Sequence, residues 1–72
     1  MTIIRNEQIR SGKPTIKGTR VTVGDIVDRF YRLGKSSSGI AKDLNITEDD
    51  VEDALRYYHN EVLDQTPSGI EA

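Results

Sequence analysis

The sequence predicts one small domain that is mainly α-helical, with short β-strands at its N-terminus. Three observations support this fold class. Apolar residues recur at helical spacing from residue 23 onward, which indicates helices that bury one face. Two threonines just before such segments are each followed three residues later by an aspartate, the pattern of a helix-capping box. The first 22 residues instead combine glycine, proline and β-branched residues, which is typical of turns and short strands.

The N-terminal segment is predicted to hold the strands. Thr2–Ile4 has the composition of a short strand and needs a neighbour to be stable. The polar stretch Asn6–Ser11 is expected to be a loop. In Gly12–Thr22, Pro14 fixes its own φ, while Gly12 and Gly18 permit a positive φ. The positions assigned a structural role are Gly12, Pro14, Gly18, Thr19 and, at the end of the first helix, Gly34.

The same Gly12–Thr22 segment carries two lysines and an arginine. We expect a tight, cationic hairpin or loop whose backbone N–H groups face outward. Such a surface can bind an anion, either a phosphate or a carboxylate of another protein. The alternative is a purely structural turn with solvated charges.

The first helix is predicted to begin after Thr22 and to end before Gly34. Asp25 stands three residues after Thr22, so each side chain can bond the backbone N–H of the other residue. Glycine is common just past a helix end because it adopts a positive φ without strain. The apolar face of this helix consists of Val23, Ile26, Val27, Phe30 and Leu33.

Two further helices are predicted in the second half of the chain. One begins at a serine within residues 36–38 and ends at Asn45, which tolerates the left-handed conformation. Thr47 and Asp50 repeat the capping pattern before the other. The residues that these two helices and their connection would bury are Ile40, Ala41, Leu44, Ile46, Val51, Ala54, Leu55, Tyr58 and Val62.

Residues 37–55 fit a helix-turn-helix, a unit that often reads DNA. The outward positions of its second helix are mostly acidic, however, and carboxylates are repelled by a polyanion. If DNA is bound, the basic residues near the N-terminus are therefore the better candidates. The outward positions are Glu48, Asp49, Glu52, Asp53 and Arg56.

Length and composition bound the remaining possibilities. The chain has 72 residues and no cysteine, and a chain of this size buries only about 60% of its unfolded surface. No apolar run approaches the roughly 20 residues of a membrane span, and the N-terminus lacks the apolar core of a signal peptide. We expect a soluble, cytoplasmic protein that does not bind membranes and gains stability from self-association or from a partner. Its expected domain covers residues 1–65, followed by a flexible tail at 66–72.

Charge is unevenly distributed along the chain. Residues 1–20 hold five basic residues and one acidic residue, whereas residues 43–72 hold nine acidic residues and one basic residue. This polarity favours head-to-tail or strand-exchanged dimers. We predict a homodimer in which Thr2–Ile4 and Thr15–Val21 pair across a two-fold axis, because exposed strand edges invite such pairing.

Catalytic constellations are missing from the sequence. The single histidine, His59, lies on the polar side of the third predicted helix, where a surface role is expected. Acidic residues near the start of that helix suit its dipole, so they do not by themselves indicate a metal site. We predict a protein that is not an enzyme and has no cofactor and no metal.

Several motifs together resemble a bacterial and archaeal family labelled only as a domain of unknown function, whose members are described as VapB-like antitoxins. The resemblance covers about residues 8–60 and depends most on a Gly-x-Pro-x-Ile-x-Gly-Thr-Arg run at residues 12–20. The other motifs are Ile26-Val27, Leu33-Gly34, Ile40-Ala41, the acidic stretch 47–51 and residues 54–58.

The resemblance implies a winged-helix-like or helix-turn-helix domain whose N-terminal strands form a homodimer. It also implies a partner, a PIN-like ribonuclease toxin encoded nearby that cuts RNA with metal-bound carboxylates. Lys13, Lys17 and Arg20 lie on the motif and are the expected contacts with this toxin. The alternative function is a DNA-binding transcriptional regulator, or autoregulator, that uses promoter DNA as its partner. For either partner, the expected binding residues are Arg10, Lys13, Lys17 and Arg20.

Overall fold

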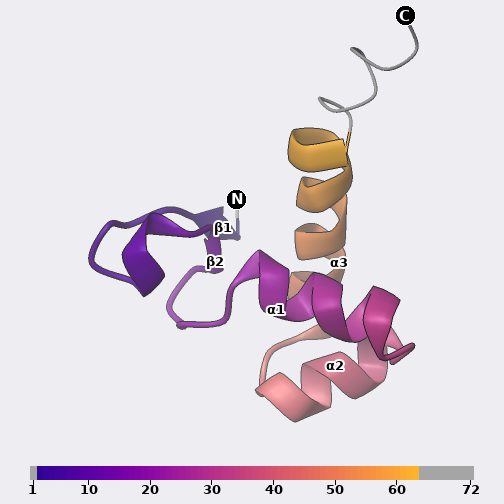
Figure 1. Ribbon diagram of the computed structural model, residues 1–72. Coiled ribbons are helices and arrows are strands. Elements are labelled where there is room, and N and C mark those ends of the chain that lie inside the picture. The colour runs from indigo at the N-terminus through magenta and orange to yellow at the C-terminus, as the bar shows by residue number, and fades with distance from the viewer. Residues whose placement is uncertain (1, 64–72) are drawn as a thin grey trace, which may run out of the picture.

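The chain is arranged as an N-terminal arm, residues 2–22, beside a group of three helices (Figure 1). The computed structural model describes residues 2–63, and it describes side chains as far as residue 61. The predicted tail at 66–72 and the side chain of Val62 lie outside these residues. Within residues 2–63, no helix has the length and apolar character required to cross a bilayer.

The arm contains the two predicted strands. β1 (Ile3–Ile4) pairs antiparallel with β2 (Thr15–Ile16), and Ile3 lies opposite Ile16. The pairing expected across a two-fold axis is thus formed within one chain, and the homodimer itself stays a prediction. Between the strands, the expected loop includes a 3₁₀ turn, η1 (Arg10–Gly12).

The first helix begins as predicted. Thr22 and Asp25 form a complete capping box at the start of α1 (Val23–Val27). The helix then continues into a π-helical turn, η2 (Asp28–Arg32), in which the N–H of Leu33 donates to the carbonyl of Asp28 at 3.3 Å. Gly34 follows with φ +69°, which confirms its expected role as the helix-ending residue.

The two predicted helices of the second half of the chain and the turn between them are also confirmed. Ser36 caps α2 (Ser37–Leu44), and Asn45 ends it with φ 57°. Thr47 caps α3 (Glu48–Tyr57), which continues into a second π-helical turn, η3 (Tyr58–Leu63). The domain is therefore mainly helical with a short N-terminal hairpin, as the sequence predicted.

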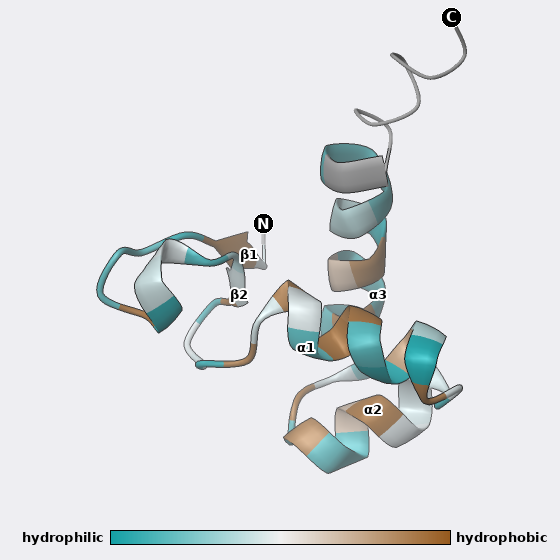
Figure 2. Ribbon diagram, in the orientation of Figure 1, coloured by the Kyte–Doolittle hydropathy of each residue, from teal (hydrophilic) through white to brown (hydrophobic). Residues whose placement is uncertain are grey.

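The core lies between the three helices and includes two isoleucines of the arm, Ile3 and Ile16. Figure 2 shows hydrophobic residues on α1 and α2 and mostly hydrophilic residues along the outer loop of the arm. Leu33 was expected in the core but is 49% exposed, because the wider π-helical turn rotates it away from the buried face. The buried apolar residues are Ile3, Ile16, Val23, Ile26, Ile40, Ala41, Val51 and Ala54.

Gly24 gives a first test of the helical assignment. It is exposed in the first turn of α1, and a Cβ atom there would meet only the Thr22 hydroxyl, at 3.7 Å. Since nothing in the fold requires glycine, Gly24→Ala should raise the free energy of unfolding by about 0.5–1 kcal/mol. Urea denaturation measures the change. Gly34→Ala is the matched control and should destabilise the chain because of its φ of +69°; a loss of stability in Gly24→Ala would contradict the assignment.

Candidate functional site

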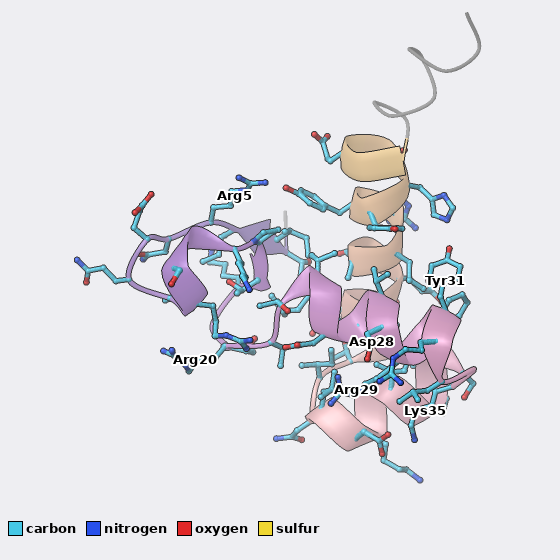
Figure 3. All side chains as sticks on the ribbon, in the orientation of Figure 1. Arg5, Arg20, Asp28, Arg29, Tyr31 and Lys35 are labelled. Carbon is cyan, nitrogen blue, oxygen red and sulfur yellow. The ribbon has the colours of Figure 1, made fainter. Side chains whose placement is uncertain are left out.

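Three of the four predicted binding residues are exposed on the arm. Lys13, Lys17 and Arg20, which we call the cationic loop, are all exposed. Among the described residues, no carboxylate forms an ion pair with any of them. Figure 3 shows Arg20 on the side of the molecule away from Tyr31 and Lys35. The loop therefore presents positive charge that the described part of the chain does not pair with a carboxylate.

The backbone that carries these cations is held in one conformation. The N–H of Thr19 donates to the carbonyl of Ile16 at 3.0 Å, and Gly18 has φ +82°. This combination fits a type II turn, which needs a positive φ at its third residue. The Thr19 hydroxyl donates to the same carbonyl at 2.9 Å and accepts the N–H of Val21 at 3.0 Å. The structural roles predicted for Gly18 and Thr19 thus have a geometric basis.

Hydrogen bonds to the rest of the molecule fix this turn in place. The N–H of Lys17 donates to the carbonyl of Thr2 at 2.6 Å, and the carbonyl of Pro14 accepts the N–H of Val23 at 2.9 Å. The N–H groups of Lys17, Thr19 and Val21 are therefore bonded within the chain, which corrects, for these three residues, the expectation that the backbone donors face outward. The exposed side chains of Lys17 and Arg20 remain available to an anion.

Arg10 is placed differently from the other three predicted residues. Its Nη1 atom donates to the carbonyl of Arg20 at 3.0 Å and lies 3.4 Å from Oδ2 of Asp25. The side chains of Arg10 and Asp25 are 37% and 33% exposed. Arg10 is thus engaged within the chain.

A second group of cations lies on η2, α2 and the turn between them. Arg32 donates two hydrogen bonds to Asp28, at 2.6 and 3.0 Å, and this pairing lowers the pKa of Asp28. Lys35 lies 2.9 Å from Asp43 and lowers the pKa of that carboxyl group. Both carboxylates are therefore ionised at neutral pH, and each neutralises a nearby cation. The sequence did not predict these pairs.

The acidic side of α3 remains largely exposed. Glu48, Asp49 and Glu52 are exposed, whereas Asp50 caps the helix. Asp53 accepts a hydrogen bond from the Thr2 hydroxyl at 2.7 Å, which ties the arm to α3. Within the described part of the chain, these carboxylates do not form a group able to hold a metal ion.

An aromatic cluster joins η2 to η3. The hydroxyl of Tyr31 lies 2.9 Å from Nε2 of His59, and the Tyr31 ring centroid lies 6.2 Å from that of Tyr58. His59 is exposed, as predicted. The sequence did not show that it would meet Tyr31, because the two residues are 28 positions apart.

A shallow pocket of about 270 Å³ lies on α3 and η3. Its lining contains no serine, threonine, cysteine or histidine, so it lacks the pairing of nucleophile and imidazole base used in acyl transfer. The lining residues are Asp53, Arg56, Tyr57, Asn60 and Glu61. We take the cationic loop as the candidate site, because its cations form no ion pair among the described residues.

Comparison with known families gives one match. A family model described as "Protein of unknown function (DUF433)" matches residues 3–58. Neither the curated proteins nor the solved structures contain a match.

Proposed function

Because this chain belongs to the DUF433 family, whose function is unknown, we propose a function from its own surface: it binds a protein partner and has no catalytic activity. The cationic loop docks onto an acidic site of that partner. In line with the resemblance to VapB-like antitoxins, the partner is a PIN-like ribonuclease encoded nearby, which the chain neutralises.

The main support is that the cationic loop combines charges that form no ion pair among the described residues with a backbone that hydrogen bonds hold in place. Lys17 lies on a turn that hydrogen bonds already hold in place, Arg20 directly follows that turn, and both are exposed. Lys13 is exposed on the other side of β2. A loop that is ordered before binding loses less conformational entropy when it binds. Lysine and arginine form their strongest hydrogen bonds with ionised acceptors such as carboxylates. A ribonuclease that holds metal ions with carboxylates offers such acceptors at its active site.

The second candidate is a DNA-binding regulator, which is favoured by the helix-turn-helix of α2 and α3. The exposed carboxylates Glu48, Asp49 and Glu52 lie at the start of α3, where a recognition helix usually contacts bases. In this alternative the cationic loop, and not α3, would contact phosphate groups. Binding would then weaken steeply with salt, since phosphate contacts release counterions.

The test uses the PIN-like nuclease encoded by the adjacent reading frame. Lys17→Glu combined with Arg20→Glu should weaken binding roughly 100-fold, because two attractive charges become repulsive. Calorimetry measures the affinity, and cleavage of a labelled RNA measures inhibition. Lys42→Glu, on the exposed side of α2, makes the same type of charge change away from the loop and should change binding much less.

Two outcomes would decide against this proposal. If the unaltered chain neither binds nor inhibits the nuclease, the antitoxin function is wrong. If it instead shifts its own upstream DNA at about 50 mM salt, and the loop variant abolishes the shift, the DNA-binding alternative holds.

A further inference from the structure

We infer that Arg10 is a positioning residue, which holds the cationic loop in its binding conformation and does not contact the partner. This inference rests on the proposed function, because the loop that Arg10 positions is the proposed docking site. It separates Arg10 from Lys13, Lys17 and Arg20, with which the sequence grouped it.

The backbone at Arg10 and Ser11 adopts a conformation that is unfavourable for residues with a side chain, and packing in the core does not account for it. Arg10, Ser11 and Gly12 have φ values of 51°, 60° and 81°. The left-handed region costs most residues other than glycine roughly 1–2 kcal/mol each. None of η1 is buried, so burial of these residues does not offset the strain. What the turn achieves is to direct the Arg10 side chain across the arm to Arg20 and Asp25.

One nitrogen of Arg10 joins the loop to the first helix. Nη1 donates to the carbonyl of Arg20 at 3.0 Å, at the end of the cationic loop. The same nitrogen lies 3.4 Å from Oδ2 of Asp25 in the first turn of α1. That oxygen also accepts the N–H of Thr22 at 3.1 Å. The loop, its stem and α1 therefore share one polar junction.

The junction sets the direction in which the loop projects. The N–H of Lys17 bonds to Thr2 on one side of the loop, and Arg10 holds Arg20 on the other. Without Arg10, the segment after Thr19 would lose its side-chain anchor to α1. A partner that binds Lys17 and Arg20 together would then have to order the loop at a cost in affinity.

Asp25→Asn is expected to change nuclease binding in opposite directions, depending on whether Arg10 positions the loop or contacts the partner. The asparagine oxygen can still accept the N–H of Thr22, but the ion pair with Arg10 is lost. If Arg10 positions the loop, nuclease binding should weaken about fivefold. If Arg10 instead contacts the partner, release from Asp25 should strengthen binding, and the inference is overturned. Asp28→Asn is the matched control, since it removes the partner of Arg32 on η2 and should leave binding unchanged.

A double-mutant cycle gives an independent readout. Arg10→Met should weaken nuclease binding about tenfold in the unaltered chain. The same change should have almost no effect in a Lys17→Ala, Arg20→Ala background, because the two cations whose placement depends on Arg10 are no longer present. Equal losses in both backgrounds would show that Arg10 contacts the partner itself.

A measurement without the partner separates this inference from the proposed function. In Arg10→Met, amide hydrogen exchange at Thr19 and Val21 should accelerate about tenfold, while exchange in α3 stays unchanged. If the nuclease fails to bind the unaltered chain, the proposed function is wrong, yet faster exchange would still support the role of Arg10 in ordering the loop. Unchanged exchange at both amides would overturn that role.

Discussion

Ile26→Ala is expected to remove much of the protein's free energy of unfolding at room temperature. Ile26 is completely buried on α1 and belongs to the same core cluster as Ile40, Val51 and Ala54. Replacing a buried isoleucine with alanine costs about 2–5 kcal/mol, because apolar contacts are lost and a cavity remains. Small domains have free energies of unfolding near the lower end of about 5–15 kcal/mol. A loss of this size would remove much of the stability.

Urea denaturation followed by circular dichroism measures this effect. The unfolding midpoint should fall sharply, or the native baseline should disappear. Leu33→Ala is the control, because Leu33 is 49% exposed and its truncation should change stability by no more than about 0.5 kcal/mol. Equal effects of the two substitutions would contradict the assignment of Ile26 to the core and Leu33 to the surface.

The helix boundaries could be predicted because short-range interactions set them. Thr22 with Asp25, and Thr47 with Asp50, form capping boxes three residues apart. Asn45 adopts the left-handed conformation that ends α2. Each feature involves neighbours in the chain, so the sequence contains all the information needed to find it.

The π-helical turns could not be predicted in the same way. The spacing of apolar residues alone does not distinguish an α-helix, in which each N–H bonds the carbonyl four residues back, from a π-helical turn, in which it bonds the carbonyl five residues back. The π-helical turn η2 moves Leu33 onto the surface, where it is 49% exposed. Packing against the rest of the molecule decides between these states, and that packing is not visible in a local pattern.

The candidate site likewise has features that the sequence predicts and features that it does not. Residue type and spacing identified the cationic loop and the glycine of its turn. They did not identify the partner of Arg10, because its contacts with Arg20 and Asp25 span 10 and 15 residues. They also placed the backbone donors on the outside, whereas Lys17 donates to Thr2, far away in sequence. Contacts across the fold, and not composition, decide which charges remain free.

The largest expected effect on the loop comes from Gly18→Val. Gly18 has φ +82°, and a Cβ atom there would meet no heavy atom within 4 Å. Any loss of stability therefore comes from the backbone conformation and not from a clash. A β-branched residue strongly disfavours a positive φ, so we expect a loss of about 2 kcal/mol in the free energy of unfolding. The turn should also relax, which would displace Lys17 and weaken nuclease binding.

Gly18→Asn tests whether such a loss of stability is caused by the positive φ or by the added side chain. Asparagine also adds a Cβ atom, but it adopts the left-handed region more readily than valine. Its loss in the free energy of unfolding should therefore be well below that of Gly18→Val, and nuclease binding should be largely kept. Similar losses for both residues would mean that the positive φ of Gly18 is not what limits this position. That result would contradict the turn that holds Lys17 and Arg20 in place, and with it the preordered loop on which the proposed docking depends.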